Sequence, residues 1–170
     1  MKSMFKSGIL ACLIIVSQVG ATEDASGREE FEQHLKSLLT DFHQAAADAD
    51  GERYFSLFAP NAVFLGTSPE ERWTFEEFME FARPYFDSGR GWTYTALSRN
   101  IEVAPGGDIA WFDEVLNSEK YGLCRGSGVL TKVEGEWKIA QYNLALLVPN
   151  EIALDVVDLI RHELEKGDSD

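Results

Sequence analysis

The sequence predicts an α+β domain in which helices come first and an antiparallel meander follows. Apolar residues recur at helical spacing between residues 31 and 49, and again between 75 and 86. From residue 92 onward the apolar period changes to two. Turn-forming residues at Pro105-Gly106-Gly107 and Glu134-Gly135 divide that region into strands. The helical half therefore precedes the sheet.

Residues 1–21 have the pattern of a signal peptide. Two lysines precede an apolar run over Gly8–Val16, which is too short to span a bilayer comfortably, and Val19-Gly20-Ala21 supplies small residues for cleavage. We expect an exported protein, periplasmic or extracellular, that begins at Thr22. A lipoprotein signal with Cys12 as the lipidated residue is the alternative.

Residues 22–170 are long enough for one domain with a core of its own. Cys124 is the one cysteine outside the signal, so no disulfide within the mature chain is expected. The net charge is −14 for the whole chain and −16 without Lys2 and Lys6. Nucleic acid and anionic membrane are therefore excluded as expected partners. The acidic residues either favour a cationic ligand or maintain solubility.

Capping boxes mark the starts of two predicted helices. The first box is Ser26-Gly-Arg-Glu29 and its helix ends near Asp48–Gly51, before a short helix over Glu52–Phe58 and a strand over Ala62–Gly66. The second box is Thr74-Phe-Glu-Glu77. Its helix is expected to be kinked or ended by Pro84. The apolar face that this helix is expected to bury consists of Phe75, Phe78, Met79, Ala82 and Phe86.

Four strands and a last helix complete the predicted domain. The strands are expected near residues 92–104, 108–117, 122–133 and 136–148, and Asn150 can cap the helix. The second of these strands is apolar on both faces, so both faces of the sheet must be covered. Helices and a pocket can cover one face. The last helix, a second subunit or both can cover the other.

The two predicted hairpins place polar residues opposite glycines. A two-residue turn at Glu134-Gly135 pairs Gln141 with Gly128, and Asn143 with Gly126. A turn at Glu119-Lys120 pairs Asp113 and Trp111 with the same two glycines. Trp111, Asp113, Gln141 and Asn143 are thus predicted to border a glycine-lined hollow. A register slip of one residue would reverse these assignments.

Asp113 is the candidate general acid or base, because burial in an apolar cavity raises the pKa of a carboxyl group. Its alternative role is to satisfy a backbone or tyrosine group. On the other face Glu114 is expected to pair with Arg125. Cys124 is expected to act as a small hydrophobic residue.

The three histidines have no metal-ligand spacing, so no metal site is predicted. His34 and His43 are expected to be solvated residues of the first helix. Tyr54 and Trp73 flank the first strand region and are predicted to lie near the mouth of the pocket.

Four segments together resemble the SnoaL-like branch of the nuclear transport factor 2 (NTF2-like) superfamily. They are Leu57-Phe-Ala-Pro-Asn-Ala-Val-Phe64, Trp73-Thr-Phe-Glu-Glu-Phe78, Ile109-Ala-Trp-Phe-Asp113 and Gly135-Glu-Trp-Lys-Ile139. The resemblance covers roughly residues 30–150. It implies a cone, in which a curved antiparallel sheet wraps around N-terminal helices, here with a C-terminal helix added.

The resemblance also implies a homodimer packed through the sheet and chemistry without a cofactor. Members of the superfamily include acid–base enzymes, such as isomerases, cyclases and dehydratases, and many binding or assembly modules. SnoaL-like proteins often carry histidine on the last strand, where this chain has Gln141 and Asn143. Neither amide can take a proton at neutral pH.

The sequence therefore favours an exported domain that binds a small, mostly apolar molecule in its cone. Asp113 would line the pocket with Trp111, Gln141 and Asn143. One alternative is a cofactor-independent acid–base enzyme in which Asp113 moves the proton. The other is a dimeric interaction module.

Overall fold

The structure is a computed structural model that describes residues 16–167. Most of the predicted signal peptide lies outside these residues, so it stays a prediction. The chain divides into two units, one ending at His34 and one beginning at Leu35. In the first unit the described residues form a helix. None of the helices in the described range has the length and apolar character needed to cross a membrane.

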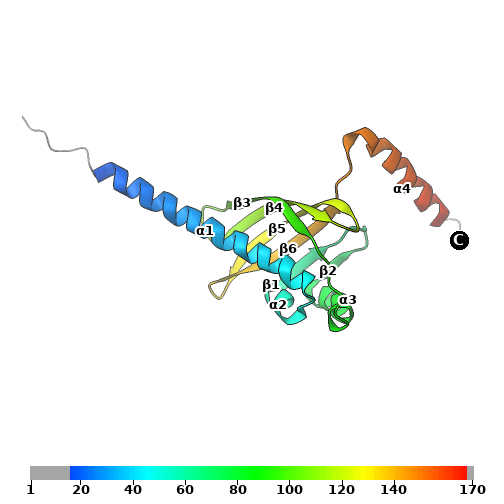
Figure 1. Cartoon of the computed structure of the whole chain (residues 1–170), viewed down its shortest axis with the longest axis horizontal. Coiled ribbons are helices and arrows are strands. Elements are labelled where there is room, and N and C mark those ends of the chain that lie inside the picture. Colours follow the sequence, from blue (N-terminus) through cyan, green and yellow to red (C-terminus); the bar gives the residue numbers. More distant parts are fainter. Residues whose placement is uncertain (1–15, 168–170) are drawn as a thin grey trace, which may run out of the picture. The chain divides into compact units, whose positions relative to one another are not determined.

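The second unit is an α+β domain built on one six-stranded sheet (Figure 1). The strand order is β2-β1-β6-β5-β4-β3. The helices are α1 (Val16–Ala47, shared with the first unit), α2 (Gly51–Ser56), α3 (Phe75–Asp87), the 3-10 turn η1 (Asn150–Ile152) and α4 (Ala153–Gly167). The strands are β1 (Phe58–Leu65), β2 (Arg72–Thr74), β3 (Thr95–Val103), β4 (Ile109–Ser118), β5 (Gly122–Val133) and β6 (Glu136–Leu146).

The predicted fold class and curved sheet are confirmed, but the sheet is not wholly antiparallel. Strand β1 runs parallel to β6, with Phe64 beside Tyr142. Strand β1 precedes the meander in the sequence, and it adds to the sheet beside β6, the last strand of the meander.

One of the two predicted helix starts is correct. Helix α1 is continuous from Val16, so it does not begin at the Ser26 box. Thr74 caps helix α3 as predicted: the Glu77 Oε2 atom accepts from the Thr74 backbone N–H at 2.8 Å, and Thr74 Oγ1 accepts from the Glu77 N–H at 3.4 Å. Pro84 lies inside α3, which continues to Asp87.

The two hairpins differ in how closely they follow the prediction. Glu134 and Gly135 form the two-residue turn, with φ angles of 54° and 88°. Between β4 and β5, however, Ser118 pairs with Gly122, so this loop contains three residues rather than two. Gly122 takes the left-handed conformation that such loops need, with φ of 68°. Strand β6 also contains a bulge at position 140, since Leu130 pairs with Ile139 but Val129 pairs with Gln141.

The two faces of the sheet have different environments. The inner face packs against α1, α2 and α3, and its side chains at Phe112, Leu130 and Ile139 are buried. On the outer face Ile109, Trp111 and Leu123 are each about half exposed.

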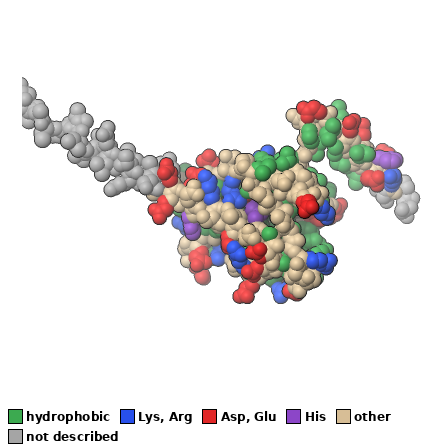
Figure 2. All heavy atoms as spheres, in the orientation of Figure 1, with side chains coloured by type: hydrophobic (Ala, Val, Ile, Leu, Met, Phe, Trp, Pro, Cys, Tyr) green, Lys and Arg blue, Asp and Glu red, His purple; other side chains and the backbone are tan. Residues whose placement is uncertain are grey.

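Helix α4 also exposes apolar side chains, at Leu154, Leu159 and Leu164, and Figure 2 shows green side chains along it. Because the large apolar side chains on the outer face of the sheet are about half exposed, no element of the described chain covers that face fully.

Candidate aromatic cavity with a buried glutamate

A cavity of about 350 Å³ lies on the inner side of the sheet. Helices α1, α2 and α3 supply part of its wall, and β1, β2 and β6 supply another part. Three loops supply the remainder: the loop between β1 and β2, the loop before β3 and the loop between β4 and β5. Eleven of its eighteen lining residues are aromatic: Phe42, Tyr54, Phe64, Trp73, Phe78, Phe81, Tyr85, Trp92, Tyr94, Tyr121 and Tyr142.

Stacked rings fix the shape of this wall. Phe64 on β1 stacks on Phe78 of α3 with ring centroids 3.9 Å apart, and Trp73 stacks on Phe81 at 4.8 Å. Such contacts add to the apolar burial that holds α3 on the sheet. They also leave flat apolar surfaces, against which a planar ligand can lie.

Most of the polar groups in the lining are tyrosine hydroxyls. All five tyrosines of the chain are among the lining residues, together with His43, Thr67, Glu71 and Lys120. Burial raises the pKa of Tyr94 to about 12. Its hydroxyl is therefore protonated at neutral pH and available as a donor.

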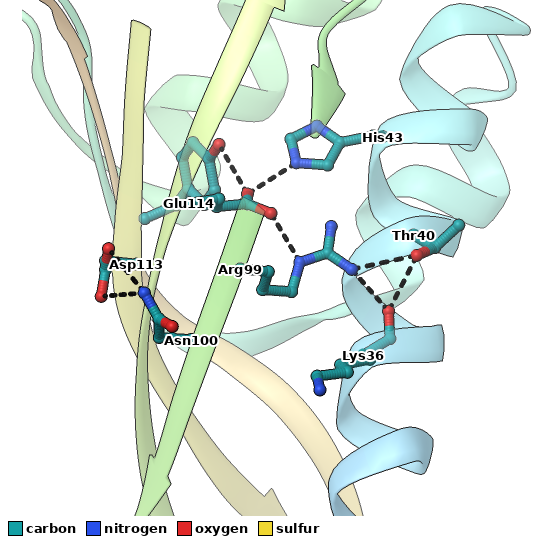
Figure 3. Close-up of polar contacts among 8 residues, drawn as sticks. Lys36, Thr40, His43, Arg99, Asn100, Asp113 and Glu114 are labelled. Carbon is teal, nitrogen blue, oxygen red and sulfur yellow. Dashed lines mark hydrogen bonds and ion pairs between the residues drawn. The ribbon is translucent and has the colours of Figure 1, made fainter. Parts of the chain in front are cut away.

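Behind this wall Glu114 is fully buried and is held by three side chains (Figure 3). Its Oε1 atom lies 2.6 Å from Nε2 of His43 and accepts from the Tyr142 hydroxyl at 3.3 Å. Its Oε2 atom accepts from Nε of Arg99 at 2.7 Å. The carboxylate thus joins β4 to α1, β3 and β6.

Arg99 carries this network on to the helix. Its Nη1 group donates to the Lys36 carbonyl at 2.7 Å and to Thr40 Oγ1 at 3.0 Å. The guanidinium is therefore bound on both sides, to a carboxylate and to the backbone of α1. This fixes α1 over the inner face at the turn that carries His43.

The charges around Glu114 keep it ionised. Burial alone would raise its pKa, but the hydrogen bond and charge of His43 and those of Arg99 outweigh burial and lower it. An ionised carboxylate only accepts hydrogen bonds, so Nε2 of His43 carries its hydrogen and donates it to Glu114. Burial and the nearby Glu114 charge also raise the pKa of Tyr142 well above its ordinary value.

Tyr54 is also fully buried, but its hydroxyl has no hydrogen-bond partner within the described chain. Its ring stacks on Phe42 at 4.8 Å. Burial raises its pKa well above the ordinary value. Tyr54 is thus a neutral donor in the cavity wall. It lies deep in the core, not near the mouth as predicted, whereas Trp73 is partly exposed.

The predicted glycine-lined hollow does not exist. A Cβ atom at Gly126 would contact the Tyr142 hydroxyl and Glu114, and one at Gly128 would contact the backbone carbonyl of Gln141 and the Phe112 ring. Gly126 therefore makes room for side chains of the neighbouring strands, and Gly128 for the backbone of β6 and the Phe112 ring. The cavity lies farther from the sheet, between those side chains and the helices.

The four residues predicted around that hollow do lie together, but on the outer face. Trp111 pairs across β5 with Val129, which pairs with Gln141, and neither Trp111 nor Gln141 lines the cavity.

Asp113 and Asn143 share the next row with Ser127 and are likewise absent from the cavity wall. Figure 3 shows Asp113 and Asn100 pointing away from α1. Nη1 of Arg125 lies 3.0 Å from Asp113 Oδ1, so the predicted Glu114–Arg125 pair is also wrong.

The cause is a register difference of one residue in each hairpin. The three-residue loop before Gly122 moves Glu114, rather than Asp113, opposite Gly126. The bulge at position 140 moves Tyr142, rather than Gln141, opposite Gly128. Gly122 indicates the longer loop, because three-residue hairpin loops favour glycine at the left-handed position. No residue in the sequence indicates the bulge.

The prediction that His43 is solvated was also wrong. It is 9% exposed, not solvated, because the buried stripe of α1 includes Leu39 and Phe42 beside it. Its spacing of four from Leu39 was a usable signal. Within residues 16–167, no group of three or more His, Cys, Asp or Glu side chains is arranged to hold a metal ion.

A family model described as a SnoaL-like domain matches residues 35–149. The chain belongs to the SnoaL-like family. This confirms the resemblance to the NTF2-like superfamily. A search of curated proteins finds no significant match.

Solved structures support the same fold for this SnoaL-like domain. An NTF2-like protein of unknown function from Pseudomonas putida KT2440 is 14% identical, with a TM-score of 0.61 over 72% of this chain and 91% of that one. A candidate scytalone dehydratase from Novosphingobium aromaticivorans DSM 12444 is 13% identical, with a TM-score of 0.61 over 73% and 89%.

A candidate ketosteroid isomerase from Parabacteroides distasonis ATCC 8503 is 18% identical, with a TM-score of 0.54 over 68% and 86%. At identities this low, all three likenesses concern the fold alone.

Proposed function

We propose that this SnoaL-like domain binds a small, mostly apolar molecule in its cavity. The observation that carries the proposal is the cavity of about 350 Å³ with a largely aromatic wall. That volume falls within the range of small-molecule pockets, which are mostly apolar with a few placed polar groups. Two structural neighbours are named for enzymes of small molecules, scytalone and ketosteroids.

The chemistry of the wall narrows the ligand. Stacked rings favour a flat hydrocarbon framework, and the tyrosine hydroxyls favour at least one acceptor oxygen. Glu71 and Lys120 are the charged side chains of opposite sign in the lining. The ligand we expect is therefore uncharged and aromatic or alicyclic, with a carbonyl or ether oxygen.

Calorimetric titration with tetralin and 2-tetralone tests the proposal. These fused-ring probes differ by one carbonyl group. Burial of most of their apolar surface gives an expected Kd on the order of 10–100 µM. Failure of both probes to bind at their solubility limits would contradict the proposal.

Substitutions then locate the bound probe. Leu144 lines the cavity, so Leu144→Trp should fill it and weaken both probes at least about tenfold. Leu123 lies half-exposed on the outer face, and the matched change Leu123→Trp should leave binding unchanged. Thr67→Trp, in the exposed loop that lines the cavity, provides a second block if the first variant is unstable. Equal effects of Leu144→Trp and Leu123→Trp would place the probe elsewhere.

The two alternatives from the sequence now stand differently. Asp113 is partly exposed, paired with Arg125 and absent from the cavity wall, so acid–base chemistry through it has lost its geometric basis. A dimeric interaction module would use the exposed outer face of the sheet.

A further inference from the structure

We propose that helix α4 of one copy packs on the outer face of the sheet of a second copy, and that the two copies exchange their helices reciprocally. This contact is independent of the cavity and of what the cavity binds. Helix α4 lies outside residues 35–149, the part of the chain that the SnoaL-like family model matches. The contact would therefore use an element that the matched domain does not include.

One side of α4 is apolar. Residues spaced four apart form a stripe along this side, which starts in η1: Ile152, Val156, Ile160 and Leu164. Charged side chains lie on the opposite side: Asp155, Asp158, Arg161 and Glu165. Ile160 and Leu164 are 54% and 66% exposed, and no side chain of α4 is buried within the described chain. The stripe therefore has no cover in that part of the chain.

A helix of this length needs a packing partner. Isolated helices shorter than about 12–15 residues are marginal in water, and helices in proteins gain most of their stability from burial of an apolar face. Helix α4 has 15 residues. We therefore expect its stripe to be buried in the assembled protein.

Charge limits what the partner of α4 can be. The helix carries four acidic and two basic side chains, which leaves a net charge of −2 with His162 neutral. An anionic membrane or a nucleic acid would repel it. A protein surface with exposed apolar side chains suits the stripe, and Trp111 and Ile109 form such a surface on the outer face of the sheet. Each copy of the chain thus carries both halves of the contact.

The connection to α4 is fixed at one end of this outer face. The Leu147 N–H donates to the Leu123 carbonyl at 3.0 Å, which ties the connection to the start of β5. Leu123 pairs with Asn117, six residues along β4 from Trp111, so Trp111 lies about 20 Å away towards the other end of the sheet. A two-fold axis in the interface, perpendicular to the strands, brings that other end of the second copy to the start of α4. The stripe then meets Trp111 of the second copy.

The area of contact favours exchange over a simple pair of helices. One side of a 15-residue helix is about 22 Å long and about 10 Å wide, or about 220 Å² in projection. Two α4 helices packed on each other would cover about 440 Å², far below the roughly 1,200 Å² of a small stable interface. Reciprocal packing on two sheets covers twice as much, and the neighbouring parts of the sheets add to it. Exchange of an identical element is also a low-cost route to a dimer.

Crosslinking between two distinguishable chains tests the contact on the whole protein. A tagged Val156→Cys chain and an untagged Glu102→Cys chain are mixed and treated with a short bis-maleimide. Val156 lies in the middle of the stripe, and Glu102 is the neighbour of Trp111 across the β3–β4 pair. We expect a covalent product that contains one chain of each kind. Cys124 is buried in every chain and gives the same background.

Controls separate exchange from the other ways of covering the stripe. Asp158→Cys, on the opposite side of α4, is the matched control for Val156→Cys and should give much less mixed product. When Val156→Cys and Glu102→Cys are combined in one chain, a crosslink inside that chain would place α4 on its own sheet. A product between two Val156→Cys chains would show that α4 pairs with α4. Either result, or equal yields from Val156→Cys and Asp158→Cys, would overturn the proposal.

Sedimentation equilibrium then measures how much the stripe contributes to the dimer. Ile160→Glu should raise the Kd of the dimer at least about tenfold, because a charge would have to be buried in the contact. Leu154→Glu, at an exposed position on the other side of the same helix, should leave the Kd unchanged. Both positions lie outside the core, so far-UV circular dichroism should show the same fold for both variants. Equal Kd values for the two variants, or a protein that never dimerises, would contradict the exchange.

Discussion

Glu114 is the residue on which the inner side of the domain most depends, because its charge is removed from water and must be balanced inside the protein. Arg99 and His43 supply that balance, and Tyr142 adds a third donor. Removal of one partner of a buried ion pair is far more destabilising than removal of a pair at the surface. Both kinds of ion pair occur here on adjacent residues. Glu114 makes the buried pair, and Asp113 pairs with Arg125 where both side chains are about half exposed.

We expect Glu114→Gln to lower the free energy of unfolding by about 3 kcal/mol at pH 7, because Arg99 then stays buried without its counter-charge. The pKa of Glu114 is lowered in the folded protein. Its stabilising contribution is therefore complete above the ordinary glutamate pKa, and it is lost as pH falls below about 4.3 towards the folded value.

Urea denaturation from pH 7 to pH 3 measures this. The difference between wild type and Glu114→Gln should narrow below about pH 4.3, while Asp113→Asn should change stability by less than about 1 kcal/mol throughout. A difference between wild type and Glu114→Gln that is constant with pH would mean that Glu114 is not ionised in the fold.

At the scale of elements, the pairing of β4, β5 and β6 decides which side chains face the cavity. The strand locations, the Glu134–Gly135 turn and the Thr74 cap were predictable, because periodicity and turn residues are local signals. The site was not, because a side chain's face depends on register, and register depends on loop length and on a bulge. Four residues predicted to share one face of the sheet do share one, but it is the outer face and not the face of the cavity. They are Trp111, Asp113, Gln141 and Asn143.

The glycines of β5 provide a test at this scale. Gly126→Ala should destabilise the protein by about 1–3 kcal/mol, because the new methyl group contacts Tyr142 and Glu114 in a tightly packed region. Gly106→Ala, in a turn with open space around it, is the control and should be nearly neutral. Thermal and urea unfolding measure both. Equal stability of the two variants would contradict the observed packing across Gly126.

The outer face of the sheet exposes large apolar side chains to solvent. Leu97, Ile109, Trp111 and Leu123 are 49–60% exposed there. We propose that a second copy of the chain covers this face, since an interface there would remove these apolar side chains from water. A homodimer would cover both copies of the face at once.

Light scattering coupled to size-exclusion chromatography tests the dimer. The wild-type protein should have twice the monomer mass, and Trp111→Glu combined with Ile109→Glu should halve it, because two charges would have to be buried at the interface. Leu159→Glu, on the exposed side of α4, is the comparison. A wild-type monomer at all concentrations would refute the proposal.

The surplus residue at position 140 has a consequence for comparing this protein with others. On either side of Ala140, strand β6 follows two different alternations: Trp137 and Ile139 point inward before it, Tyr142 and Leu144 after it. An alignment without a gap to a relative that lacks the extra residue would be out of frame beyond this point. It would assign Gln141 and Asn143 to the interior of this chain, where Tyr142 and Leu144 lie.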